Sequence, residues 1–394
     1  MNGSEHPPAK VRRAPADRPE IAAAQRVVIK VGTRVLTGDD GGLALSRLFA
    51  LVETAARLRR RGREVLIVSS GAVGLGRDAL GLATSPLELA ERQACAAVGQ
   101  CRLMALYDAG FARLGLVCAQ VLLTQSDFDD RARYLALRDT LTALLRHGVV
   151  PVINENDTVS TEELAFVGAA HGERPVFGDN DRLAALVATK LGAELLLLAT
   201  DVEGLYDRDP REPGARLVER LDDPATLDGA LPGAASGGSG RGGIRSKVES
   251  AWIAARSGCH AVIASGRRPG ALDAVLDGAT VGTWFPAHAG ALPARHRWLA
   301  FATAPRGVLH LDAGAVAALR ERGASLLARG VTRVDGEFER GEAVDLVGPD
   351  RRRVGRGIVY CDAAAARAWS AGQAPDGVRN HHALIHRDHL VLEP

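Results

Sequence analysis

The sequence is poor in cysteine, and its cysteines are not arranged in pairs. The five are Cys95, Cys101, Cys118, Cys259 and Cys361. No CxxC pair occurs, and no histidine stands at the spacing of a metal ligand. An odd number of scattered thiols argues against a disulfide scaffold and predicts free cysteines in a reducing compartment.

Long hydrophobic runs and a strong charge of one sign are absent as well. No window has the length and apolarity of a membrane span, and the first twenty residues lack the apolar segment of a secretory signal. A net charge of +2 does not mark the whole chain as a binder of nucleic acid or of membrane surfaces. We therefore expect a cytoplasmic protein with no membrane contact, in which residues 1–22 form a disordered leader.

Several fingerprints of common enzymes are missing too. The chain contains no GxxxxGK[ST] phosphate loop and no GxGxxG dinucleotide motif. It also offers no candidate Ser–His–Asp triad and no cluster of His and Cys that would bind a metal.

What is present indicates an ordinary globular protein with two domains. The 394 residues are 46% hydrophobic and 24% charged. Over residues 23–286, apolar strands alternate with amphipathic helices, which predicts a three-layer α/β/α sandwich with a mainly parallel open sheet. Residues 287–295 are typical of a linker. Short alternating runs over 296–394 predict a small, mostly β domain.

One polar stretch interrupts the apolar pattern. The predicted strand Val149–Ile153 continues into Asn154-Glu155-Asn156-Asp157, and Gly178-Asp179-Asn180-Asp181 precedes a helical pattern. Open α/β folds bind ligands at the carboxyl edge of the sheet, where such residues would lie. The alternative is a pair of Asx-rich turns and a helix cap.

Two cationic segments have the composition of phosphate-binding loops. Lys30-Val31-Gly32-Thr33 leaves a strand end, and a glycine-rich run from Gly237 ends in Arg241-Gly242-Gly243-Ile244-Arg245-Ser246-Lys247. Glycines let backbone amides approach an anion, Ser246 is a candidate helix cap, and the lysines add full charge. The alternatives are a surface lysine and a flexible linker.

Two further strand ends carry small polar residues. Ser70-Gly71-Ala72 offers a hydroxyl and free amides at a helix start, which suits a carboxylate or serves as a plain cap. Thr200-Asp201 ends another strand, with an ordinary turn as the alternative. A site with cationic loops and several aspartates suits phosphoryl transfer from Mg-ATP to an amino acid.

The chain resembles the glutamate 5-kinases of the amino-acid kinase superfamily. The motifs that carry the resemblance are, in chain order, Val28–Thr33, Val68–Ala72, Ala97–Gln100, Pro151–Asp157, Gly178–Asp181, Thr200-Asp201-x-x-Gly204-Leu205-Tyr206 and Gly242-Gly243-x-x-Ser246-Lys247. The C-terminal domain resembles the PUA domain that many members carry. The expected fold is therefore the amino-acid kinase fold followed by a PUA-like domain.

The resemblance implies a role for each matching residue. The residues implied to hold L-glutamate are Ser70, Gly71, Ala72, Asp157 and Asn180. Those implied to hold ATP are Lys30, Gly32, Thr200, Asp201, Arg241, Gly242, Gly243, Ile244, Arg245, Ser246 and Lys247. Lys30, Lys247 and Asp181 are implied to be catalytic, with Asp181 orienting the two lysines. Mg²⁺ arrives with ATP, and no side chain is assigned to it.

The resemblance also implies a homo-oligomer and feedback inhibition by proline. Two departures from the family pattern bear on these expectations. Residues 167–176 form an insertion, so we expect 158–177 to be a longer lid than usual over the glutamate site. Arg241, Ile244 and Arg245 replace the Thr, Met and small residue that the family favours. Both leave the reaction type unchanged, and both bear on substrate affinity and inhibition.

Two alternatives to phosphorylation of glutamate remain at this point. One is a related kinase that acts on aspartate or N-acetylglutamate. The motifs Asn154-Glu155-Asn156-Asp157 and Gly178-Asp179-Asn180-Asp181 argue against it. The other is an RNA-binding protein in which the PUA-like domain is active and the kinase domain is a scaffold. Retention of Lys30, Lys247, Asp157 and Asp181 together argues against that scaffold.

Overall fold

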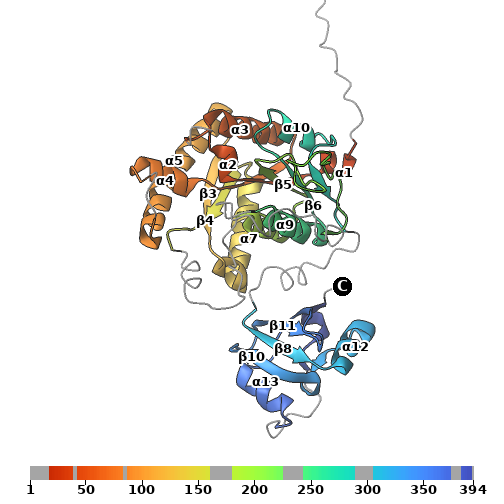
Figure 1. The fold of residues 1–394 in the computed structure, drawn as a ribbon. Helices are drawn as coiled ribbons and strands as arrows, with labels where there is room; N and C mark the ends of the chain where they lie inside the picture. The colour runs from red at the N-terminus through yellow and green to blue at the C-terminus, as the bar shows by residue number, and fades with distance from the viewer. Residues whose placement is uncertain are drawn as a thin grey trace, which may run out of the picture.

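The computed structural model describes residues 17–38, 42–82, 87–159, 180–224, 243–288, 305–373 and 383–392 (Figure 1). In these ranges, residues up to 288 build one sheet with its covering helices. Residues from 305 onward build a second, smaller set of strands and helices.

The first part is organised around a seven-stranded sheet, counted over the described residues, in the order β3-β4-β2-β1-β5-β6-β7. Its strands are β1 (Arg26–Val31), β2 (Glu64–Ser69), β3 (Cys118–Leu123), β4 (Val150–Glu155), β5 (Leu195–Thr200), β6 (His260–Ser265) and β7 (Thr283–Phe285). All pairings are parallel except that of β7 with β6. The predicted mainly parallel sheet is confirmed, and the antiparallel edge strand β7 is an addition to it.

The central strands are apolar because both faces of the sheet are covered. All six residues of β5 are buried, as are all residues of β1 except Arg26. Successive side chains of a strand point to opposite faces. Val28 accordingly packs in one core, while Val27 and Ile29 pack in the other.

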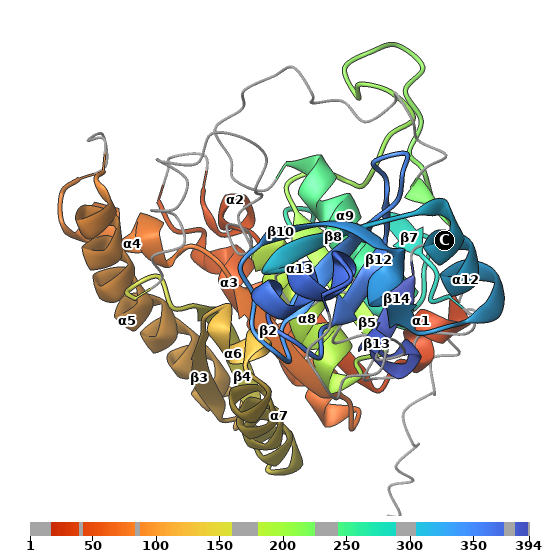
Figure 2. The same ribbon diagram turned by 90° about the horizontal axis from the view of Figure 1, so that it is seen from below.

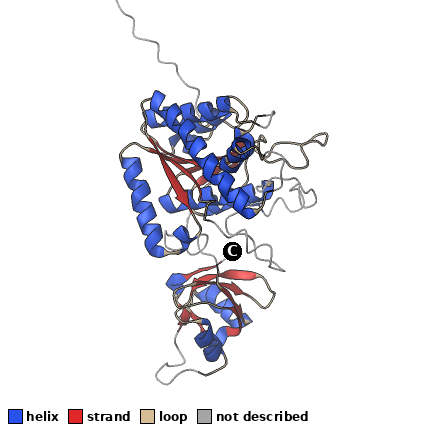
Figure 3. Ribbon diagram, turned by 90° about the vertical axis from the view of Figure 1, so that its left-hand side faces the viewer, coloured by secondary structure: helices blue, strands red, loops and turns tan. Residues whose placement is uncertain are grey.

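Helices cover each face and form the two outer layers (Figure 3). One core is lined by α6 (Ser126–Asp129), α7 (Arg131–Arg146), α8 (Asn180–Leu191) and α9 (Ile244–Arg256). The other is lined by α1 (Pro19–Ala23), α2 (Thr33–Leu36), α3 (Leu45–Arg60), α5 (Leu89–Arg113) and α10 (Ala271–Leu276). The three-layer α/β/α architecture is therefore confirmed. Over the described ranges, no helix has the length and apolarity needed to cross a membrane.

Strand β1 stands at the point where the strand order reverses. It pairs with β2 on one side and with β5 on the other, so the connections leave it in opposite directions. In open parallel sheets this reversal opens a crevice beyond the carboxyl ends of the strands. The residues that follow β1, β2, β4 and β5 all lie at that edge.

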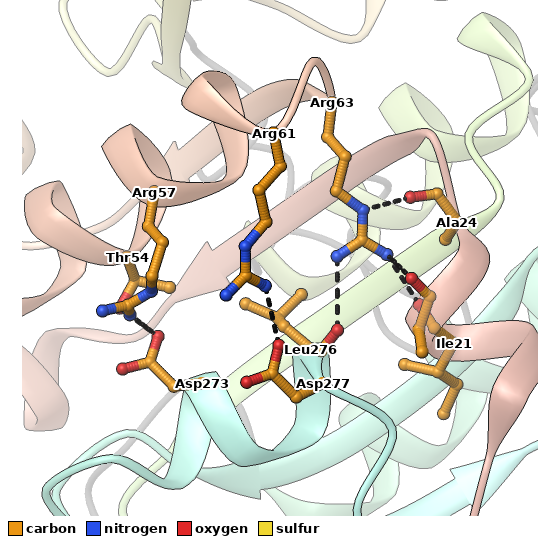
Figure 4. A network of polar contacts seen from close by, with 10 residues as sticks. Ile21, Ala24, Thr54, Arg57, Arg61, Arg63, Asp273, Leu276 and Asp277 are labelled. Carbon is orange, nitrogen blue, oxygen red and sulfur yellow. Dashed lines mark hydrogen bonds and ion pairs between the residues drawn. The ribbon is translucent and has the colours of Figure 1, made fainter. Parts of the chain in front are cut away.

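Residues 17–22 belong to the fold, so the predicted disordered leader is wrong for this segment. Arg18 is buried and donates hydrogen bonds to the carbonyls of Val281 and Glu219, at 3.0 and 2.9 Å. Arg63 donates to the carbonyls of Ile21 and Ala24, at 2.9 and 2.6 Å (Figure 4). Buried arginines satisfied by carbonyls tie α1 to the sheet layer. Residues 1–16 lie outside the described ranges.

The second part contains a five-stranded sheet, β10-β8-β11-β12-β14, and a two-stranded pair, β13-β9, within the described residues. Its strands are β8 (Gly307–Leu311), β9 (Leu326–Leu327), β10 (Val331–Gly336), β11 (Ala343–Val347), β12 (Arg353–Ile358), β13 (Ala383–Ile385) and β14 (Leu390–Leu392). Helices α12 (Ala313–Arg322) and α13 (Ala363–Ser370) pack on its core. The strands of the predicted domain are confirmed, and the two helices were not predicted.

The predicted linker begins later than residue 287. The backbone N–H of Ala287 donates to His260 Nδ1 at 2.9 Å, and that of His288 donates to the carbonyl of Ala255 at 3.0 Å. Both residues are thus part of the first domain. Residues 289–304, which contain the rest of the linker and the expected start of the second domain, lie outside the described ranges.

Helix α4 (Ala72–Ala79) and α5 are in backbone contact, and they lie side by side in Figures 1 and 2. A Cβ at Gly99 would lie 1.7 Å from the carbonyl oxygen of Ala72. A Cβ at Gly76 would lie 1.8 Å from the carbonyl oxygen of Cys95. Glycine at these two positions lets α5 approach the first turn of α4, which follows the end of β2.

We predict that Gly99→Ala lowers the free energy of unfolding by about 1–3 kcal/mol, because the added methyl group forces two helix backbones apart. Gly74→Ala is the matched control, since nothing lies within 4 Å of a Cβ there. That change should be neutral or stabilise the helix by up to about 1 kcal/mol. Urea unfolding followed by circular dichroism measures both variants, and equal stability of the two would contradict the assigned contact.

Candidate active site

Two lysines from distant parts of the chain share one buried carboxylate. Lys30 Nζ lies 2.6 Å from Asp181 Oδ1, and Lys247 Nζ lies 3.0 Å from Asp181 Oδ2. The Asp181 side chain is fully buried, and those of Lys30 and Lys247 are only 5% and 11% exposed. The three groups carry a net charge of +1, so the cluster is suited to receive a further anion.

The environment keeps Asp181 ionised. Burial alone would raise the pKa of this carboxyl group, but the charges of Lys30 and Lys247 and their hydrogen bonds lower it below its usual range. Asp181 is also the second residue of α8, where the positive end of the helix dipole favours an anion.

The positions of the three residues follow from local sequence patterns. Lys30 comes two residues after Val28 on β1, so both side chains point to the face that α8 and α9 cover. Asp181 opens α8, and Lys247 lies in the first turn of α9. The structure thus brings the three predicted residues together, with the carboxylate of Asp181 between the ammonium groups of the two lysines.

A row of polar side chains lies at the same edge of the sheet. Asn180 Nδ2 donates to Ser70 Oγ at 2.8 Å and to Asn154 Oδ1 at 3.1 Å. Asn154 Nδ2 donates in turn to Gln100 Oε1 at 2.9 Å. Ser70, Gln100 and Asn154 are buried; Ser70 directly follows β2, Gln100 lies on α5 and Asn154 on β4. We call these four residues the amide relay.

The site prediction did not include Asn154 or Gln100, although both stand within quoted motifs. The available signal was a carboxamide in an apolar context. Asn154 follows four buried residues of β4, and Gln100 lies on the buried face of α5 between Ala96 and Leu103. Buried polar groups need partners, so such positions point to a network.

The turn after β2 supports the predicted carboxylate seat. The backbone N–H of Ser70 donates to the carbonyl of Val31 at 3.1 Å, which continues the sheet to this residue. Gly71 then takes a φ of 107° and caps α4, a conformation that favours glycine. Ala72 begins the helix and is buried. Asp157 lies in the turn that follows β4, half-buried.

The residues assigned to ATP lie partly within the described ranges. Gly32 caps α2, and a Cβ there would lie 3.5 Å from Lys30 Nζ, so the glycine leaves the lysine approachable. Thr200 Oγ1 donates to Asp201 Oδ1 at 3.1 Å at the end of β5. Arg34, which the prediction omitted, pairs with Asp201 Oδ2 at 3.2 Å.

That environment shifts the titration of Asp201. Burial would raise the pKa of this carboxyl group, but a backbone hydrogen bond and the contacts with Arg34 and Thr200 lower it overall. Asp201 is therefore ionised at neutral pH, and both of its carboxylate oxygens are hydrogen-bond acceptors.

The glycine-rich segment is described only from residue 243 onward. Gly243 caps α9, so the prediction that Ser246 caps this helix is wrong, and Ser246 lies inside the first turn. Ile244 begins the helix, and the exposed Arg245 pairs with Glu249 at 3.2 Å. Arg241, Gly242 and residues 160–179, which include most of the predicted lid, lie outside the described ranges.

No group of three or more His, Cys, Asp or Glu that could hold a metal occurs among the residues with described positions. The buried charge that the site does offer is cationic, from Lys30 and Lys247. This donor set is suited to a triphosphate that brings its own divalent cation.

Comparison with known proteins gives two family matches. Residues 25–265 match the model of the amino acid kinase family, and residues 307–379 match that of the PUA domain. Among curated relatives named glutamate 5-kinase, that of Chromohalobacter salexigens is 47% identical over 386 residues, covering 96% of this chain and 98% of its own. Those of Thioalkalivibrio sulfidiphilus and Bradyrhizobium diazoefficiens are 45% and 43% identical, each covering 95% of this chain and 99% of its own.

We predict that Asp181→Asn lowers the free energy of unfolding at pH 7 by roughly 3–5 kcal/mol, because two buried ammonium groups lose their shared partner. The deficit should shrink as the pH falls through the lowered pKa of Asp181, where the wild-type carboxylate becomes neutral as well. Urea unfolding between pH 7 and pH 3 measures this. Asp222→Asn, in the exposed pair with Arg220, is the control and should change stability little. An equal effect of both substitutions would contradict the electrostatic role.

Proposed function

The chain belongs to the amino acid kinase family, and from that premise we propose that it works as an ATP-dependent glutamate 5-kinase. It transfers a phosphoryl group to the γ-carboxylate of L-glutamate and yields L-glutamyl 5-phosphate and ADP, the first step of proline synthesis. The observation that carries the proposal is the pair of buried lysines on Asp181, next to the amide relay at one sheet edge.

The chemistry needs charge neutralisation more than proton transfer. The γ-carboxylate of glutamate is already ionised at pH 7, because such groups have pKa values of about 4.3, so no general base is required. A carboxylate oxygen forms a bond to the γ-phosphorus, and the bond from that phosphorus to the bridging oxygen of ADP breaks. Lys30 and Lys247 bring two anions together by offsetting the charge between them.

On the glutamate side, Ser70, Gly71 and Ala72 receive a carboxylate of the substrate through a hydroxyl group and helix N-terminal amides. Asp157 pairs with the ammonium group, and Asn180 supplies an amide oxygen beside it. The buried Oδ1 of Asn180 has no partner among the described residues, which supports a ligand donor at this position.

On the nucleotide side, Lys30, Gly32 and the segment Arg241–Lys247 hold the phosphates, and Thr200 and Asp201 receive the nucleoside. This set includes Gly242, Gly243, Ile244, Arg245 and Ser246, as the motif order implies. Mg²⁺ enters as the MgATP substrate and offsets phosphate charge, while Asp181 keeps Lys30 and Lys247 directed at the transferred group.

The family resemblance extends the proposal to partners. It implies a homo-oligomer and inhibition by proline, and we place the protein in the cytoplasm. RNA binding through the PUA domain, which matches over residues 307–379, is the alternative from another class of function. A gel shift with structured RNA over a range of salt concentrations tests it, since such binding weakens as salt rises.

We predict that the purified protein releases ADP with glutamate far faster than with aspartate or N-acetylglutamate. The free ammonium group and the chain length of glutamate match Asp157 and the carboxylate seat, and N-acetylglutamate lacks that ammonium group. A coupled ADP-release assay measures this, with proline added in a parallel series and glutarate as a test of the ammonium contact. Equal use of glutarate and glutamate would exclude the Asp157 assignment, and preference for another acid would overturn the proposed function.

We predict that Lys247→Met lowers kcat roughly a hundredfold to a thousandfold and changes the glutamate KM only a few-fold. The reason is that the ammonium group acts mainly on charge that develops in the transition state. Lys190→Met is the matched control, because Lys190 lies at the opposite end of α8 with its Nζ over the ring of Tyr134. Thermal melting verifies that both variants fold, and an unchanged kcat in Lys247→Met removes this lysine from the catalytic group.

A further inference from the structure

Gln100 is a carboxamide placed where the helix pattern calls for an apolar residue. It lies on the buried face of α5 with Ala96, Leu103 and Tyr107, and it is 7% exposed. Its Oε1 accepts a hydrogen bond from Asn154 Nδ2 at 2.9 Å, and its Nε2 has no partner among the described residues. A buried amide is costly, so its presence calls for a role beyond packing.

The amide relay has a direction, and Gln100 stands at its start. A planar amide presents oxygen on one side and nitrogen on the other, so the orientation of one group determines what the next must present. Because Gln100 presents oxygen, Asn154 turns its nitrogen toward α5 and its oxygen toward Asn180. The Nδ2 group of Asn180 then donates one hydrogen bond to Asn154 Oδ1 and one to Ser70 Oγ.

The far end of the relay is an acceptor that has no donor among the described residues. With both N–H groups of Asn180 engaged, its Oδ1 is left over, buried and unpartnered among the described residues. Asn180 directly precedes Asp181, so this oxygen belongs to the same helix start that holds the two lysines. An ammonium group supplies the N–H donors that this oxygen lacks. If the relay ran in the opposite direction, Asn180 would present N–H groups and repel an ammonium group.

We propose that Gln100 is a positioning residue that sets the direction of the amide relay and thereby makes the enzyme select acids with a free ammonium group. The proposal rests on the proposed function, since the ammonium group in question is that of glutamate. Gln100 acts through Asn154 and Asn180, with no contact to the substrate. Its place is fixed by the neighbouring Gly99, which brings α5 into backbone contact with Ala72.

The test compares glutamate with glutarate, which has the same two carboxylates and no ammonium group. For Gln100→Met, which keeps the volume and removes the acceptor, we expect kcat/KM for glutamate to fall roughly tenfold or more. Glutarate, measured as a substrate or as a competitive inhibitor, should bind as well as before, and the KM for ATP should not change. The preference for glutamate over glutarate therefore falls by the same factor.

Three further variants separate positioning from mere support of the fold. Gln100→Glu keeps an oxygen toward Asn154 and should retain most of the preference. Tyr107→Phe removes another buried hydrogen bond of α5, that with Ser69 Oγ at 2.9 Å, and should lower the melting temperature without changing the preference. Gln100→Asn keeps an amide that is too short to reach Asn154, and it replaces Gln100→Met if that variant does not fold.

The outcomes are distinct. A wild-type protein inactive on glutamate overturns the proposed function and this inference with it. A wild-type protein that prefers glutamate, with the preference unchanged in Gln100→Met or Gln100→Asn, leaves the function standing and overturns the inference. Equal losses for glutamate and glutarate in these variants also overturn it, because they indicate structural support alone.

Discussion

The structure depends on the attraction between the carboxylate of Asp181 and the ammonium groups of Lys30 and Lys247. This attraction offsets the free-energy cost of burying three charged groups. Lys30 lies within the central strand and Lys247 in the first turn of α9, and both pair with the buried carboxylate of Asp181. Since one carboxylate cannot neutralise two lysines, the cluster keeps a positive charge. The remaining charge favours an anion at this edge of the sheet.

Close backbone packing positions the turn Ser70-Gly71-Ala72 that follows β2. Gly76 and Gly99 let α4 and α5 touch, and Gly71 turns the chain from β2 into α4. On the opposite side of the same layer, Arg57 and Arg61 pair with Asp273 and Asp277 of the α10 region (Figure 4). The glycine contacts join α4 to α5, and the two ion pairs join α3 to the α10 region, all on the same face of the sheet.

Much of the fold could be predicted from the sequence. Apolar strands that alternate with amphipathic helices indicate a parallel sheet with helices on both faces. Lys30, Asp181 and Lys247 could be grouped only through the family motifs, since their contacts span distances in sequence that no local pattern reports. Asn154 and Gln100 were missed because a single carboxamide in an apolar run predicts a partner without identifying it. The residue type of Ser246 predicts a helix cap, whereas the backbone geometry shows that Gly243 is the N-cap of α9. Residues 17–22 look like a polar leader, and only the distant carbonyls that bind Arg18 and Arg63 order them.

Asn180 and Asp181 are consecutive residues, yet one completes the amide relay and the other pairs with Lys30 and Lys247. A single peptide unit, about 3.8 Å from Cα to Cα, therefore joins the amide relay to the pair of lysines. Covalent geometry of this kind does not relax with temperature or solvent as packing does. A displacement of the first turn of α8 therefore moves the backbone of Asn180 and of Asp181 together, and it disturbs the amide relay and the lysine contacts at the same time.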